Sequence, residues 1–154
     1  MNLSTHFSLE ELTRSQSALR KGIDNTPGPS EIKNLSRLCI DLLEPIRGVL
    51  GVPMHIDSGF RCKEVNAAVE GAKTSAHIDG RAADIVPVGM DLHKAFDIIR
   101  NAMYFPLDQV IIECDSWIHV AIPKDGALPR RQALIAKRVK AGKGNTKWAY
   151  EAVK

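Results

Sequence analysis

An aspartate interrupts an apolar segment near the middle of the chain, Ala82-Ala83-Asp84-Ile85-Val86. The small and β-branched residues around it predict a buried strand. A lone carboxylate in such a strand is unfavourable unless it is paired or bound to a metal ion. The fold of this chain must therefore bring a partner to Asp84.

Two histidines are candidates for that partner. Six residues separate His77 from Asp84, and Gly80 allows the chain to turn between them. His119 lies in a second apolar strand, Trp117-Ile118-His119-Val120. Imidazole and carboxylate are both zinc ligands, and three such ligands leave a fourth tetrahedral position for water, as in a catalytic site. Taken alone, a histidine in a strand is usually an ordinary core or surface residue.

Helices are expected before the strands. The sequence Ser8-Leu9-Glu10-Glu11 is a capping box that begins a helix at Ser8. A loop rich in Gly and Pro, residues 22–29, precedes a longer helix that Ser30 is expected to cap. Pro45 should kink that helix, and Gly51 should end it. Its apolar positions repeat every three or four residues, at Ile32, Leu35, Leu38, Leu42, Ile46 and Val49.

Short strands dominate the second half of the chain. The expected elements are a strand over 54–58, a helix over 63–70, a strand over 82–86, a helix from Asp91 to Arg100, and a hairpin of strands 109–113 and 117–122. Helices that precede a group of short strands predict an α+β fold, with N-terminal helices packed on a small, mainly antiparallel sheet. A further helix is expected near residues 130–141.

Charge divides the chain into two parts. Residues 1–123 carry 12 Lys/Arg and 16 Asp/Glu, whereas residues 124–154 carry 9 Lys/Arg and 2 Asp/Glu. We therefore expect a domain over 1–123 and a basic C-terminal segment over 124–154, which favours polyanions as partners. Only Trp148 and Tyr150 are aromatic in that segment, so nucleic acid is disfavoured as a partner.

Several classes of protein are excluded by composition. The chain has 154 residues and three cysteines, which are too few for a disulfide framework. No apolar run approaches the roughly 20 residues of a transmembrane helix. The first residues have neither a basic flank nor an apolar region, so we expect synthesis in the cytoplasm without a signal peptide.

The central motif resembles a known family. The pattern Ser75-x-His77-x-x-Gly80-x-Ala82-x-Asp84, followed by Trp117-x-His119, is similar to the zinc D-alanyl-D-alanine carboxypeptidase family, whose fold is shared with the zinc-binding domain of hedgehog proteins. The segment Asp57-Ser58-Gly59-Phe60-Arg61 resembles the Ser-Gly-aromatic-Arg loop of that family. The opening His6–Leu12 and the loop 22–25 resemble its short phage and prophage branch. The resemblance covers roughly residues 5–123.

The resemblance implies roles for individual residues. His77, Asp84 and His119 would bind one zinc ion. Arg61 would face the substrate, where its guanidinium can hold a peptide carboxylate or steady the oxyanion. Ser75 would hydrogen-bond the substrate or stabilise its own turn, and Trp117 would line the cleft or pack on the sheet.

The residues expected to supply the general base differ from those in many relatives. They carry an acid three residues before the last ligand or a His two residues before it, whereas this chain has Ser116 and Trp117 there. The nearest acids are Glu113 and Asp115. With a three-residue hairpin loop, Glu113 lies opposite Trp117 and shares a face with His119, so we favour Glu113. Asp115, in the turn, remains the alternative.

The sequence therefore predicts a zinc-dependent peptidase that cleaves peptidoglycan stem peptides containing D-amino acids. It leaves open whether the enzyme is a D-Ala-D-Ala carboxypeptidase or an endopeptidase. A phage origin is expected, with action on the cell wall during lysis or as part of the virion. The alternative is a non-catalytic, zinc-stabilised wall-binding or phage structural protein.

Overall fold

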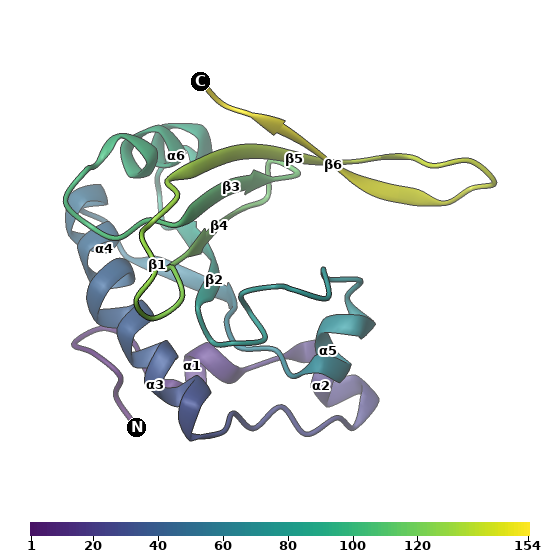
Figure 1. Ribbon diagram of the computed structural model, residues 1–154, viewed down its shortest axis with the longest axis horizontal. Helices are drawn as coiled ribbons and strands as arrows, with labels where there is room; N and C mark the ends of the chain where they lie inside the picture. Colours follow the sequence, from purple (N-terminus) through teal and green to yellow (C-terminus); the bar gives the residue numbers. More distant parts are fainter.

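The computed structural model describes residues 1–154 and confirms the expected α+β class (Figure 1). Its helices are α1 Leu9–Thr13, α2 Gln16–Lys21, α3 Pro29–Arg37, η1 Leu38–Leu43, α4 Glu44–Leu50, α5 Lys63–Ala68 and α6 Leu92–Asn101. Its strands are β1 Met54–Ser58, β2 Ala82–Pro87, β3 Gln109–Glu113, β4 Trp117–Ala121, β5 Gln132–Lys140 and β6 Thr146–Ala152. They form one sheet in the order β1-β2-β4-β3-β5-β6, in which only β3 and β5 are parallel neighbours.

The N-terminal helices begin close to the predicted residues. The Ser8 hydroxyl accepts a hydrogen bond from the Glu11 backbone N–H at 3.2 Å, which confirms the cap of α1. The long helix begins at Pro29, after Gly28, so Ser30 is not its cap. The irregularity expected at Pro45 is a π-helical stretch, η1, in which the Glu44 N–H bonds to Cys39 O. Wider turns before Pro45 accommodate a residue that has no N–H to donate.

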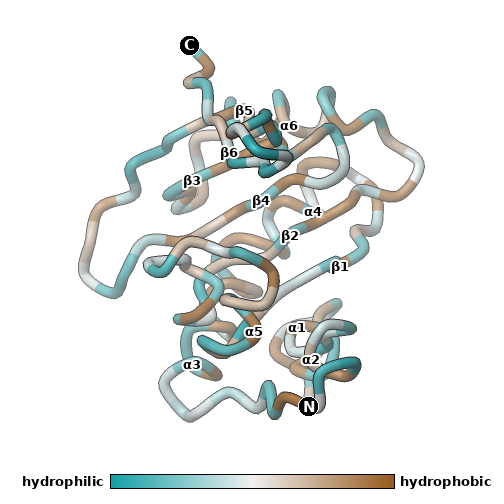
Figure 2. The backbone as a smooth tube through the Cα atoms, turned by 90° about the vertical axis from the view of Figure 1, so that its right-hand side faces the viewer, coloured by the Kyte–Doolittle hydropathy of each residue, from teal (hydrophilic) through white to brown (hydrophobic).

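The two faces of the sheet differ in chemistry. Alternate residues of β3 and β4, such as Val110, Ile112 and Ile118, are buried in the hydrophobic core. Helix α6 packs against β2, β3 and β4 on this side, and α4 packs against α6. Figure 2 shows hydrophobic colouring along the central strand β4 and more hydrophilic colouring along the edge strand β1. The intervening residues of each strand point to the other face, which carries the site.

The helix predicted near residues 130–141 is wrong. Residues 132–140 form β5, which pairs in parallel with β3 and antiparallel with β6. The segment is rich in Ala, Leu, Lys and Arg, which favour a helix locally. Pairing overrides this preference because it satisfies the backbone groups of β3 that β4 leaves free.

The basic segment is attached to the body by side chains as well as by strand pairing. Arg130 contacts the buried Asp108 through two guanidinium nitrogens, the shorter contact being 2.8 Å. Arg131 donates to the carbonyl oxygens of Ala102 and Phe105, just after α6. The division of the chain at residue 123 stays a prediction. None of the helices is both long enough and apolar enough to cross a membrane.

Candidate active site

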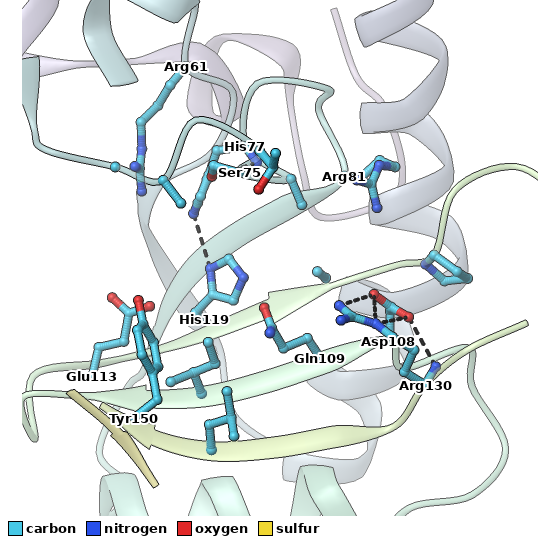
Figure 3. A pocket seen from close by; sticks show the side chains of 18 of the residues that line it. Arg61, Ser75, His77, Arg81, Asp108, Gln109, Glu113, His119, Arg130 and Tyr150 are labelled. Carbon is cyan, nitrogen blue, oxygen red and sulfur yellow. Dashed lines mark hydrogen bonds and ion pairs between the residues drawn. The ribbon is translucent and has the colours of Figure 1, made fainter. Parts of the chain in front are cut away.

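His77, Asp84 and His119 converge on one point of the sheet. His77 Nε2 lies 3.1 Å from His119 Nδ1 (Figure 3). It lies 3.2 Å from Asp84 Oδ1, and His119 Nδ1 lies 3.1 Å from the same oxygen. Ligands at about 2.0–2.2 Å from a tetrahedral zinc ion are roughly 3.3–3.6 Å apart. The three atoms therefore fit one zinc ion, and all three residues are buried.

Strand register brings two of these ligands together. Asp84 of β2 is the direct antiparallel partner of His119 of β4. The third ligand comes from the loop before β2, where Gly80 has a φ of +73°. A Cβ at this position would lie 2.7 Å from Glu31 O, so both backbone conformation and space favour glycine. The turn predicted at Gly80 is confirmed.

A backbone carbonyl fixes the orientation of His77. Its Nδ1 donates to Gly59 O at 2.7 Å, which leaves Nε2 unprotonated in the neutral ring and directed at the other two ligands. Gly59 is packed so closely that a Cβ would lie 2.2 Å from Leu12 O. The α1 helix and the ligand loop are therefore held together through one glycine.

Burial and charge set the protonation of the three ligands. Burial is the main cause that lowers the pKa of His77, so its imidazole is neutral, as metal binding requires. Burial alone would raise the pKa of Asp84. The neighbouring His77 and His119 outweigh that effect and hold the pKa of Asp84 well below its usual value. Neutral imidazoles together with an ionised carboxylate are typical ligands of a zinc ion.

Arg61 contacts the metal ligands rather than standing free in the cleft. Its Nη2 donates to Asp84 Oδ2 at 3.1 Å, and its Nε donates to Ser58 Oγ at 3.0 Å. Its Nη1 donates to Asn66 Oδ1 at 3.3 Å. The guanidinium thus orients the carboxylate that would bind the ion, while still lining the cleft.

The loop that carries Arg61 is ordered by Asn25, which the sequence analysis did not identify. The Asn25 amide donates to Thr13 O and Phe60 O and accepts from Cys62 N at 2.8 Å. Asn66, also missed, is buried and donates to Ala72 O at 2.9 Å. A polar residue between glycines and prolines gives no sign in sequence that it will bridge three backbone segments.

Glu113 lies on the same face as the ligands. It pairs directly with Trp117 across the three-residue loop 114–116, and Ile111 pairs with His119, so the expected register is observed. The Glu113 carboxylate lines the cleft with His119 and accepts a hydrogen bond from Trp117 Nε1 at 2.9 Å. Burial, followed by the negative charge of Asp84, raises the pKa of Glu113.

Asp115 is directed elsewhere. Its side chain is 67% exposed and contacts His93 Nε2 at 2.8 Å. His93 belongs to α6, which covers the opposite face of the sheet. The geometry therefore brings Glu113 to the cleft and leaves Asp115 outside it.

The remaining candidates also line the cleft. Ser75 accepts a hydrogen bond from the His77 backbone N–H at 3.3 Å, so it stabilises the ligand loop. Both Ser75 and Trp117 border the open volume in front of His77 and His119. Each can meet a substrate while keeping its structural contact.

The cleft is larger than the predicted residues alone would form. Its volume is about 800 Å³, and it extends over the C-terminal segment. The residues contributed by that segment include Arg130, Leu134, Trp148 and Tyr150. These residues could not be predicted to line the cleft, because the composition of residues 130–141 favours a helix where β5 lies.

Comparison with known proteins also indicates a zinc peptidase. A family model described as Peptidase M15 matches residues 5–121, which is most of the chain and contains all three ligands and Glu113. No curated protein matches the chain. The expectation of a zinc-dependent metallopeptidase acting on peptidoglycan-type peptides is thereby supported at the level of the family. On this match, and on a His-Asp-His site whose geometry fits one zinc ion, the chain belongs to the peptidase M15 family of zinc metallopeptidases.

Proposed function

We propose that the protein hydrolyses D-residue-containing stem peptides of peptidoglycan, with Glu113 as the general base. The observation that supports this most strongly is the placement of Glu113 beside the three ligands. Its carboxylate lines the same cleft as His77 and His119, whereas the competing acid, Asp115, faces α6. A partly buried acid with a raised pKa at a ligand cluster is typical of acid–base catalysis.

Zinc, when bound by His77, Asp84 and His119, would supply a Lewis acid and lower the pKa of a water molecule toward about 7. Glu113 would accept the proton of the attacking water and pass it to the leaving amine. Trp117 holds Oε2 of Glu113, which leaves Oε1 available for this exchange. Burial of the acid favours its protonated form, which helps it to act as the acid in the second half of the reaction.

Arg61 has a different place in this proposal from that implied by the family resemblance. Because Asp84, Ser58 and Asn66 occupy its guanidinium, its first task is to orient Asp84. Its contribution to substrate binding would come from the side of the guanidinium that borders the cleft. Ser75, beside His77, would offer its hydroxyl to the peptide backbone.

The test is mass spectrometry of purified muropeptides after incubation with the zinc-loaded protein, with and without a chelator. The proposal predicts a new product that is absent from the chelated sample, and its mass identifies the bond. Release of one D-alanine indicates a carboxypeptidase, whereas cleavage inside the peptide indicates an endopeptidase. Unchanged muropeptides with the zinc-loaded protein would refute the proposal.

The alternative, a non-catalytic zinc-stabilised wall-binding or phage structural protein, predicts no acid near the metal. The presence of Glu113 in the cleft therefore favours the enzyme. A phage origin, and action on the wall during lysis or within the virion, are part of our proposal.

Delivery to an anionic envelope by the basic segment is also part of our proposal. Lys137, Lys140, Lys143 and Lys147 are exposed, so their attraction to such a surface would be screened by salt. Replacing these four by glutamine should weaken sedimentation of the protein with purified walls at low salt. Turnover of a soluble peptide should be unchanged.

A further inference from the structure

We propose that the β5–β6 hairpin adds a binding subsite, formed by Tyr150 and Trp148. The subsite would bind residues of the substrate peptide that neighbour the two residues joined by the cut bond. The inference rests on the proposed function and extends it. The hairpin follows the segment matched by the family model, which ends at residue 121. Figure 1 shows it projecting past the ends of β3 and β4.

Strand register places Tyr150 close to the proposed base. Glu113 of β3 pairs with Ala136 of β5, and Ala136 pairs with Tyr150 of β6. The three residues form one row across the sheet, and adjacent strands lie about 4.8 Å apart. The middle residue has only a methyl group, so nothing in this row separates the side chains of Glu113 and Tyr150. Figure 3 shows them next to each other in the cleft.

Trp148 continues this surface away from the metal ligands. It lies two residues before Tyr150 on the same strand and therefore on the same face. The two rings are 6.4 Å apart between centroids, with an angle of 28° between their planes. Both rings line the cleft, and Tyr150 is 55% exposed. An exposed aromatic pair along one wall of an active-site cleft is suited to contact a ligand.

An ion pair connects this wall to the opposite one. The guanidinium of Arg138 lies 5.1 Å from the centre of the Trp148 ring and donates to Glu70 Oε2 at 2.9 Å. Glu70 follows α5 and precedes the loop that carries Ser75 and His77. This ion pair joins the hairpin to the segment before the ligand loop, at the far end of the subsite.

The position of the subsite indicates what it binds. Tyr150 is in the same row as Glu113, so the group that it meets is within one or two residues of the reacting bond. We therefore assign peptide, rather than the sugar of a muropeptide, to this subsite. Aromatic rings pack on small side chains and on the faces of amide groups, and the phenol O–H can donate to a carbonyl oxygen.

The experiment compares three substrates of increasing length. They are the two residues that flank the cut bond, capped only at an end where the stem peptide continues; the free stem peptide; and the same peptide with its disaccharide. The variants are Tyr150→Phe and the double variant Trp148→Ala/Tyr150→Ala. Glu151→Ala is the control, because this exposed side chain is on the same strand and the opposite face. Zinc content and thermal stability are measured for each.

The proposal predicts that the double variant loses roughly 10- to 100-fold in kcat/KM on both longer substrates, as expected for two aromatic contacts. Tyr150→Phe should lose less, and the shortest substrate should change by less than about twofold. Equal losses on all three substrates, or no loss on any, would overturn the proposal. A loss confined to the disaccharide peptide would also overturn it, because the rings would then bind sugar.

A second measurement separates this inference from the proposed function. Binding of the free stem peptide to zinc-loaded Glu113→Gln protein is measured by calorimetry, with and without the two aromatic substitutions. Binding weakened at least about tenfold by the substitutions supports the subsite even if the wild type cleaves nothing. Unchanged binding refutes the subsite even if the wild type is an active peptidase.

Discussion

The indole N–H of Trp117 donates a hydrogen bond of 2.9 Å to Glu113 Oε2 across the β3–β4 turn. This contact exists because a loop of three residues makes Trp117 and Glu113 direct partners in the ladder. It gives Trp117 a structural task in addition to lining the cleft. The hydrogen bond fixes the carboxylate and also lowers its pKa, opposing the effect of burial.

Replacing Trp117 by Phe keeps an aromatic ring but removes the donor. We expect zinc content to be unchanged and kcat to fall by about three- to tenfold, because the carboxylate is less well oriented. Without this donor the pKa of Glu113 rises, so the acidic limb of the kcat/KM profile should move to higher pH. Ser116→Ala is the control, since that side chain contacts only Cys114 O. An unshifted profile would show that the contact does not matter to the base.

Asp84→Asn tests the metal site. The amide has the shape of the carboxylate but no charge, and zinc favours the anion. We expect zinc content and activity to be lost together, and the thermal stability gained on adding zinc to wild type should disappear. Asp57→Asn, a partly exposed acid of β1, should retain both properties. Full activity of Asp84→Asn without bound zinc would contradict the assignment of the three ligands.

Arg61→Lys separates the two roles of Arg61. An ammonium group cannot contact Asp84, Ser58 and Asn66 in the geometry of the guanidinium fork. Because Arg61 orients a metal ligand, we expect zinc affinity to fall by about 10- to 100-fold. This is measured by competition with a chromogenic chelator. Unchanged zinc affinity with a raised KM would instead assign Arg61 to the substrate alone.

The sequence was sufficient for those features that depend on local patterns. The cluster of His77, Asp84 and His119 was indicated by ligand-type side chains in apolar strands and near a turn glycine, and the family resemblance then implied that all three bind one zinc ion. The Glu113 register followed from counting residues in one hairpin. The strand β5 could not be predicted, because its composition favours a helix and only the free edge of β3 decides otherwise. For the same reason Tyr150 and Trp148 could not be placed in the cleft.

Asp108→Asn tests how the C-terminal segment is attached. Burial alone would raise the pKa of Asp108, but its hydrogen bonds with Arg130 outweigh that effect, so the pKa is below its usual value of 3.8. A lowered carboxyl pKa stabilises the fold above pH 3.8, and that contribution is lost as the pH falls through the folded-state value.

The substitution should therefore lower the free energy of unfolding by about 1–2 kcal/mol near pH 7. The difference in the free energy of unfolding between the variant and the wild type should become smaller below pH 3.8. Thermal unfolding of chelated protein over a range of pH measures this without loss of zinc as a complication. Asp125→Asn, at an acid that is 75% exposed, is the control. If the free energies of unfolding of variant and wild type differ by the same amount at every pH, the charge of Asp108 does not stabilise the segment.

The central claim, a zinc peptidase in which Glu113 is the general base, is tested most directly by the turnover of Glu113→Gln. Glutamine cannot accept the proton of water but can still accept the hydrogen bond from Trp117. The account predicts one zinc ion per chain and a kcat lower by roughly two to four orders of magnitude. Asp115→Asn, changed at the exposed acid beside His93, should retain nearly all activity. A zinc-loaded Glu113→Gln enzyme with wild-type turnover would contradict the account.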